Sequence, residues 1–414
     1  MVPLIGFCYG ACLGLTIANV PIELFKISLG TVLFPAISVA LFSISLNFIA
    51  LPKRIGRIKW VLLSYLMFAF YQVIMSQWGQ NNLQHMQFLY TLPFLPVITY
   101  VLSYSLRIEK QLKLSLLTVL VCGGVYTIIV SFSDVRAQGM TTGENSTGIV
   151  LVLGFIMTLW QVEFSQGKLT KFFLWFCAGI FVYGVFVTAS RTAYIMLFVC
   201  GAMILKHNTK NKKQLIVVIL VITSLLFWFF RTQNYRYQLQ RTLGAYEVLQ
   251  QSGEDKPGSK NVSRRLSKDM IALDISKNNL LFGVGYANNE VLEEWYGTDT
   301  AFSHNMYLRL LSETGLVGLI LYFIFLLSIF FSIGRYKSTV PTFTQRGQHI
   351  SKVPSNSYFW LRCGFIGILI SSFFIVGFNE KPFWIWLSLI SAEHASNTKR
   401  ILKAKKEFRE LLSQ

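Results

Sequence analysis

The sequence has little charge for its length. Only 14% of its 414 residues are Asp, Glu, Lys or Arg, and 53% are hydrophobic, whereas a soluble domain carries roughly 25% charged residues. A chain this poor in charge cannot cover a water-facing surface, which argues against a soluble enzyme, a disordered protein and a coiled coil. The hydrophobic residues instead form blocks of about membrane-spanning length. The sequence therefore predicts an all-α polytopic membrane protein.

The patterns of cysteine and metal chemistry are also missing. All six cysteines lie in or beside apolar segments, outside the long polar stretch at 231–304. They are Cys8, Cys12, Cys122, Cys177, Cys200 and Cys363. Because their spacing fits neither a disulfide framework nor a metal site, we predict no metal and no cofactor. The chain begins without the basic residues and the cleavage site of a signal peptide, so its first apolar run is expected to be a membrane helix.

Apolar runs divide the chain into twelve candidate membrane helices. They lie at about 2–18, 31–51, 60–77, 87–105, 114–132, 146–163, 172–189, 192–205, 215–230, 305–334, 357–378 and 383–395. A full span of the hydrocarbon layer takes about 20 residues, so 192–205 and 383–395 are the weakest candidates. The sequence has no internal repeat of the kind found in alternating-access transporters.

Basic residues mark alternate loops between these runs. The net charge is +19, but Lys and Arg form short clusters between apolar runs and do not gather on one module, so we predict no nucleic-acid partner. Positively charged loops remain on the cytoplasmic side. The alternation therefore predicts that both termini are cytoplasmic and that the long loop faces outward.

This topology divides the chain into four parts. We expect transmembrane helices 1–9 at residues 1–230, an outer loop domain with two or more short helices at 231–304, and transmembrane helices 10–12 at 305–395. Residues 396–414 combine basic and apolar side chains, which is typical of an amphipathic helix that lies on the inner leaflet. Membrane lipids are thus a predicted partner of the whole chain.

Arginines are the first candidates for function on the outer side. Arg191, directly after Ser190, is the only charged residue between two apolar runs. Desolvating an unpaired guanidinium is costly, so Arg191 is either functional or an arginine whose charge reaches the membrane surface. Arg264 and Arg265 open a helical pattern at about 262–277. Adjacent guanidiniums suit phosphate binding, although nearby acidic residues would also account for this pair.

Two further motifs lie between the arginine pair and the next apolar run. The Gly-Val-Gly at 283–285 permits a tight turn and a close backbone approach, but it lacks the third glycine and the strand–helix setting of a dinucleotide fingerprint. His304 precedes the helix expected at 305–334 and is suited to accepting a proton near neutral pH. Its neighbours Ser303 and Asn305 are typical helix caps, which would leave the histidine a bystander.

An acidic residue enters the membrane shortly after this histidine. A carboxylate at that depth needs a partner, and the candidates for Glu313 are Arg309, Arg191 and His304. Arg309 and Glu313 are four residues apart on one helical face, so pairing between these two is the simplest expectation.

Taken in order, these motifs resemble the O-antigen ligase and polymerase superfamily of bacterial envelope glycosyltransferases. The matching residues are Ser190-Arg191, Arg265, Gly283-Val284-Gly285, His304-Asn305, Tyr307-Leu308 and Glu313-Thr314-Gly315, with Gly318 following. The chain departs from the family at 266–270, where members often carry a tryptophan, and at 279–282, where they often carry a proline. Both departures loosen the assignment within the superfamily.

The resemblance implies a metal-independent fold of the GT-C type in the bacterial inner membrane, with its active site facing the periplasm. It implies a glycan donor linked to undecaprenyl diphosphate. The acceptor is lipid A-core oligosaccharide in an O-antigen ligase, another lipid-linked repeat in a polymerase, and a protein hydroxyl in an O-oligosaccharyltransferase. The compact chain and its single large outer loop favour the ligase. A transporter of lipid-linked glycan is a further alternative, but the charged candidates cluster at the outer edge and not along a path through the membrane.

The chemistry of the residues agrees with these implied roles. Arg191 and Arg265, with Arg264 in reserve, are expected to bind the donor diphosphate and to stabilise the charge that develops as it leaves. His304 is the candidate general base that takes the proton of the acceptor hydroxyl. The supporting residues are expected to be Ser190, Asn305, Arg309 and Glu313. A single in-line step would invert the anomeric configuration.

Overall fold

The computed structural model describes most of the chain as helix. The described residues are 2–18, 21–22, 27–28, 58–76, 94–132, 141, 144–208, 259–285, 303–334, 357–374 and 381–412. Their helices are α1 (Val2–Ala18), α3 (Ile58–Ser76), α5 (Phe94–Leu106), α6 (Glu109–Val130), α7 (Glu144–Phe164), α8 (Lys168–Val187), α9 (Arg191–Asn208), α12 (Ser259–Asn278), α14 (Met306–Gly334), α15 (Ser357–Ser371) and α16 (Lys381–Leu412). Two short strands, β1 (Pro21–Ile22) and β2 (Ile27–Ser28), pair in an antiparallel hairpin.

This architecture agrees with the predicted class of helical membrane protein. Ten of the twelve predicted apolar runs overlap with helices, whereas 31–51 and 215–230 lie outside the described residues, as do residues 231–258 of the outer loop. Among the described helices, four are long and apolar enough to cross a membrane, namely α6, α7, α8 and α14. The number of twelve spans and their orientation stay predictions.

The helix α16 is longer than the sequence pattern indicates. Its apolar part was expected to end near residue 395, before a separate tail at 396–414, but α16 runs without a break from Lys381 to Leu412. No glycine or proline follows Pro382 in this helix, so nothing in the local sequence stops it. The predicted boundary between the last membrane helix and the tail therefore falls inside one continuous helix.

Polar contacts fix α16 against the ends of α5 and α6. Lys113 of α6 pairs with Glu393 at 3.1 Å. The Lys399 ammonium donates to the backbone oxygens of Tyr104 and Ser105, at 2.9 and 3.3 Å, and so satisfies carbonyls that the end of α5 leaves open. Burial lowers the pKa of Lys399, the positive charge of Arg107 lowers it further, and nearby Glu109 acts in the opposite direction.

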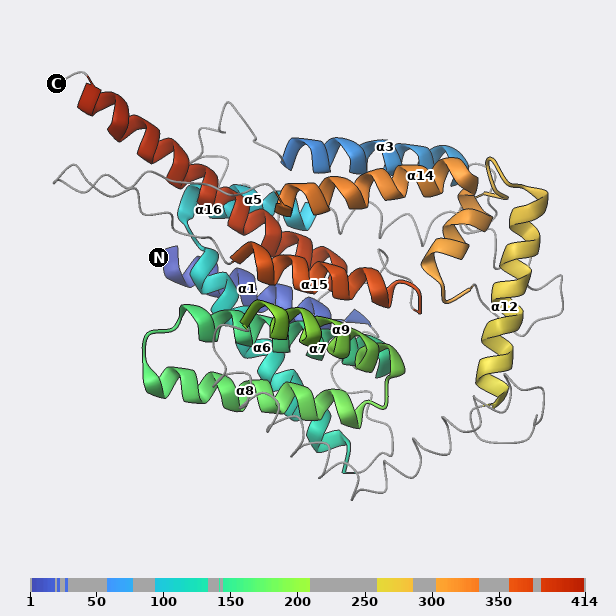
Figure 1. The fold of residues 1–414 in the computed structure, drawn as a ribbon, viewed down its shortest axis with the longest axis horizontal. Helices are drawn as coiled ribbons and strands as arrows, with labels where there is room; N and C mark the ends of the chain where they lie inside the picture. The colour runs from blue at the N-terminus through green and yellow to red at the C-terminus, as the bar shows by residue number, and fades with distance from the viewer. Residues whose placement is uncertain are drawn as a thin grey trace.

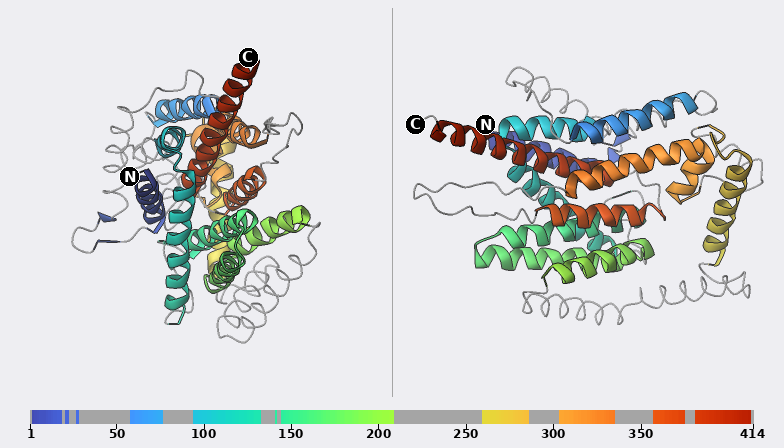
Figure 2. Two further views of the ribbon diagram at one scale, coloured as in Figure 1. Left: turned by 90° about the vertical axis from the view of Figure 1, so that its left-hand side faces the viewer. Right: turned by 45° about the horizontal axis from the view of Figure 1, so that its top comes forward.

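Most of the long helices lie roughly side by side, α6 crosses them obliquely, and α12 lies across one end of the bundle (Figure 1 and Figure 2). Both chain termini lie at the other end of this bundle, and the right-hand view in Figure 2 shows the same separation. The structure thus places the chain termini and the described helix of the long loop at opposite ends. This separation agrees with the charge pattern, which predicts that the termini and the loop lie on opposite sides of the membrane.

The core of the bundle surrounds α7, which packs against α6, α8, α9 and α15. Nearly all of α7 is buried from Thr147 to Trp160. Small residues allow this close packing, since a side chain at Gly154 would meet the ring of Phe181. The core also holds large buried aromatic side chains. They include Trp160, Trp360, Trp384, Trp386, Tyr322 and Phe325.

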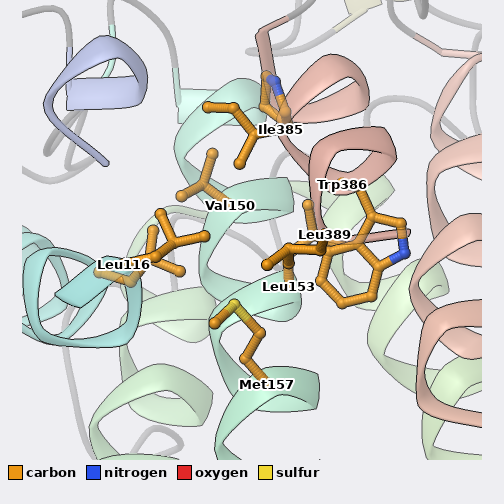
Figure 3. A pocket seen from close by; sticks show the side chains of 9 residues that line it. Leu116, Val150, Leu153, Met157, Ile385, Trp386 and Leu389 are labelled. Carbon is orange, nitrogen blue, oxygen red and sulfur yellow. The ribbon is translucent and has the colours of Figure 1, made fainter. Parts of the chain in front are cut away.

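A small apolar pocket lies between α6, α7 and α16 (Figure 3). Its lining is Leu116, Leu120, Val150, Leu153, Met157, Pro382, Ile385, Trp386 and Leu389. No charged or hydroxyl side chain borders it, so it offers no group for acid–base or phosphate chemistry. The candidate site residues lie on other elements.

Candidate functional site

The segment that carries His304 is held in place from both sides. The side-chain oxygen of Asn305 accepts hydrogen bonds from the backbone N–H groups of Tyr307 and Leu308, at 3.0 and 3.3 Å, and caps α14. The N–H of Met306, the first residue of α14, donates to the Ser372 carbonyl at the end of α15, at 3.0 Å. The predicted cap is therefore confirmed for Asn305. His304 itself is half-buried directly before the cap.

The loop helix α12 docks onto this segment. Its inward side chains repeat at helical spacing and are buried or half-buried, namely Arg265, Lys268, Asp269, Ala272, Ile275 and Ser276. In the contact with the His304 segment, the Ser303 hydroxyl donates to the carboxylate of Asp269 at 2.5 Å. Arg265 lies one turn before Asp269 on the same face of α12. The helix therefore places Arg265 one turn from the contact with the His304 segment.

Arg191 begins α9 after a sharp turn out of α8. Ala189 in this turn has a left-handed backbone, with φ of 57°, and the buried Ser190 hydroxyl accepts the Ala193 N–H at 3.3 Å as a helix cap. The same hydroxyl donates to the side-chain oxygen of Asn145 in α7, at 2.9 Å. Ser190 thus fixes the start of the helix that carries Arg191, and Arg191 itself is half-buried.

The packing of α9 on α15 shows where Arg191 lies relative to His304. The two helices run antiparallel, because the Cys200 thiol donates to the Cys363 carbonyl and Met196 lies against Gly367. Continuing this register by five residues on each helix brings Arg191 to the level of Ser372. The Ser372 carbonyl accepts the N–H of Met306, two residues after His304. Arg191 and His304 therefore lie at the same end of the bundle.

The helix α14 is broken at Gly315. This residue has φ of 67° and ψ of −169° inside the helix, and the break leaves backbone groups without helical partners. The turn at 280–285 supplies the missing partners. The N–H groups of Leu316 and Val317 donate to the carbonyls of Leu280 and Leu281, at 2.8 and 3.3 Å.

The Gly-Val-Gly motif completes the same junction. The N–H of Val284 donates to the Ser312 carbonyl at 3.0 Å, and the N–H of Gly285 donates to the Glu313 carbonyl at 2.9 Å. Gly283 has φ of 69°, and a side chain there would collide with the backbone of Glu313. The predicted close backbone approach at 283–285 is therefore confirmed, and the group that approaches is the backbone of α14.

Arg309 and Glu313 form a buried ion pair in the first part of α14. The Arg309 Nε and the Glu313 Oε1 are 2.8 Å apart, and the side chains are 3% and 1% exposed. This geometry confirms the expected pairing at four-residue spacing. The pair stands between the cap at Asn305 and the break at Gly315, so we infer that it stabilises the short helical piece that follows His304.

We expect that removing one partner of this pair destabilises the protein strongly. Glu313→Gln removes the carboxylate charge that faces the buried guanidinium of Arg309, and breaking a buried pair in this way costs about 3–5 kcal/mol. The matched control is Glu410→Gln, because Lys406 and Glu410 have the same spacing at 3.6 Å but are 81% and 62% exposed. Thermal unfolding of both variants in detergent checks the expectation. Equal melting temperatures for the two variants would contradict it.

The structure thus places most predicted site residues on three elements at one end of the bundle, of which α12 and α14 are in contact. Arg265 comes from α12, His304 and Asn305 from the start of α14, and Ser190 and Arg191 from the start of α9. Arg264 belongs to α12, but its side chain is outside the described part, so its role stays a prediction.

The sequence pattern did not identify Asp269, Asn145 or Ser372 as residues that fix this region. The four-residue spacing of Asp269 from Arg265 was an available signal, because such residues share a helical face. Asn145 and Ser372 gave no signal, because their partners lie far away in the chain.

The fold and this arrangement define a class: a helical membrane protein with arginines and a histidine gathered at the end of the bundle where α12 lies. Residues 172–323 match the protein-family model described as O-Antigen ligase. The match supports the O-antigen ligase and polymerase superfamily that the motifs indicate, and it contains all the predicted site residues. The family implies a glycosyltransferase-like ligase or polymerase in a bacterial membrane. No curated protein matches the chain.

Proposed function

We propose that the protein is an O-antigen ligase. It transfers a glycan from undecaprenyl diphosphate to a sugar hydroxyl of lipid A-core oligosaccharide at the periplasmic face of the bacterial inner membrane. The observation that supports this proposal is that the start of α9, with Arg191, lies at the same end of the bundle as α12 and the start of α14, which carry Arg265 and His304. Transfer from such a donor needs positive groups that bind the diphosphate, and it needs a base nearby that accepts the proton of the acceptor hydroxyl.

In the proposed mechanism, the arginines bind the donor. Arg191 and Arg265, with Arg264 in reserve, donate hydrogen bonds to the diphosphate and stabilise the charge that it gains as the glycosidic bond breaks. Arginine suits this task because its planar guanidinium offers several donors to phosphate oxygens at once. The Ser190 cap holds the start of α9 and so orients Arg191.

His304 activates the acceptor in this proposal. Its imidazole takes the proton of the acceptor hydroxyl while the hydroxyl oxygen attacks the anomeric carbon and the lipid diphosphate leaves from the opposite side. One in-line displacement inverts the anomeric configuration. Asn305 fixes the backbone beside His304, and the Arg309–Glu313 pair stabilises the helical piece that follows.

A reconstituted assay tests the reaction. The purified protein is placed in liposomes with lipid-linked glycan, with and without lipid A-core oligosaccharide. A ligase forms a glycan–lipid A-core product only when the acceptor is present. Lengthening of the lipid-linked pool without the acceptor would show a polymerase, and movement of the lipid-linked glycan across the bilayer without a covalent product would show a transporter.

We expect that Arg191→Ala and Arg265→Ala each reduce transfer by about 10²–10³-fold, the usual effect of removing one donor that stabilises developing charge. Lysine at either position is expected to retain more donor use than alanine, because it keeps the charge. Lys277→Ala, an exposed basic residue on α12, serves as the matched control. Initial rates at varied donor concentration provide the measurement. Full activity in both alanine variants would mean that the diphosphate binds elsewhere.

A further inference from the structure

We propose that Asp269 is a positioning residue for glycan transfer: its bond to Ser303 holds the helix of Arg265 and the segment of His304 at a fixed separation. The proposal rests on the proposed function, in which these two residues act on the donor and the acceptor. Asp269 itself touches neither substrate in this scheme. It acts through Ser303 and through α12.

The contact between Asp269 and Ser303 is short and built into the cap of α14. The Ser303 hydroxyl donates to Asp269 Oδ1 at 2.5 Å and accepts the N–H of Asn305 at 3.0 Å. Ser303 is fully buried, and a hydrogen bond to a carboxylate is among the stronger ones in proteins. The Ser303 hydroxyl therefore connects the Asp269 carboxylate to the backbone of Asn305, the residue that follows His304.

The bond is a second anchor that joins α12 to the segment before α14. The first anchor is the set of backbone bonds between the turn at 280–285 and the break in α14. It fixes the C-terminal end of α12. Asp269 stands eleven residues before Leu280, which corresponds to about 16 Å along a helix. Breaking the Asp269 contact removes a hydrogen bond that opposes a small pivot of α12 about its C-terminal end, while the buried Ala272 and Ile275 keep the helix packed.

A pivot of this kind moves Arg265 more than Asp269, because Arg265 lies one turn farther from the first anchor. A displacement of only 1 Å between reacting groups costs an enzyme about 10²-fold in rate. The two anchors together therefore fix the position of Arg265 relative to His304. The carboxylate has this effect through hydrogen-bond geometry, so an amide that can accept the same bond is expected to replace it.

Kinetics of four variants and one control variant in liposomes test this role, with donor and acceptor both at varied concentration. We expect Asp269→Ala and Ser303→Ala each to lower kcat by about 10- to 100-fold while the acceptor KM stays within about twofold. The double variant is expected to be no slower than either single variant, because both changes break the same bond. Asp269→Asn is expected to restore most of the rate. Asp274→Ala, an exposed carboxylate on the same helix, is the matched control.

A purely structural contact would lower the yield of folded protein without changing kcat per folded molecule. Normal kcat in Asp269→Ala, or multiplied losses in the double variant, would therefore overturn the positioning role. If Asp269→Ala does not fold, Asp269→Asn and Ser303→Ala decide the matter by the same criteria. A wild-type protein that transfers no glycan would overturn the proposed function first. Active wild type with unimpaired variants at both positions would overturn the positioning role alone.

Discussion

Replacing His304 with alanine is expected to reduce glycan transfer by about 10²–10⁴-fold, the usual contribution of a positioned general base. The protein should remain folded, because three hydrogen-bonded contacts fix this segment through the residues beside His304. Asn305 caps α14, Ser303 binds Asp269, and Met306 binds Ser372. The substitution therefore removes an imidazole while the cap and the docking of α12 are kept.

The measurement is the initial rate of glycan transfer to lipid A-core oligosaccharide, normalised to the amount of folded protein. The matched control is His207→Ala, since His207 is a half-buried histidine that stacks on Phe359 near the opposite end of α9. The control is expected to transfer glycan normally. Wild-type rates in the His304 variant would remove this residue from the mechanism and leave another group to accept the proton.

A side chain at Gly315 is expected to prevent correct folding of the region around His304. A residue other than glycine with this left-handed φ costs about 1–2 kcal/mol from its backbone alone. In addition, the new Cβ would collide with the Leu281 carbonyl and with the N–H of Phe282. These groups belong to the backbone of the turn at 280–285, so they cannot move aside without breaking the bonds to Leu316 and Val317.

We therefore expect Gly315→Ala to yield little folded protein and no transfer. The yield of monodisperse protein after detergent extraction and its melting temperature provide the readout. Gly179→Ala is the matched control, because a Cβ at Gly179 in α8 would meet no other atom within 4 Å. If the two variants gave equal yield and equal melting temperature, the junction between α14 and the turn would not have the geometry described above.

The helical membrane class could be predicted from the sequence because it depends on composition and on local hydrophobic runs. A continuous apolar segment must satisfy its own backbone hydrogen bonds in a membrane, and a helix does so within the segment. The pairing of Arg309 with Glu313 could also be predicted, because a four-residue spacing determines which side chains share a helical face. The cap at Asn305 could be predicted as well, because it depends only on a capping residue type directly before the helix.

The break in α14 shows the limit of local patterns. The sequence predicted one helix from residue 305 to 334, and the apolar run gives no sign of a break. A helix interior can accommodate a glycine, so the presence of Gly315 alone does not predict a kink. The break forms because the turn at 280–285 brings its own carbonyl and N–H groups to the opened backbone, and only the docked structure shows that those groups are there.

The candidate site divides in the same way. The sequence by itself determined which residue types have the required chemistry, since guanidiniums and an imidazole keep their chemistry in any fold. Only the tertiary structure decided that Arg191 and Arg265, 74 positions apart in the chain, reach the same end of the bundle as His304. The physical reason is that helix packing and single contacts such as Asp269 with Ser303 depend on surfaces that exist only after the helices assemble.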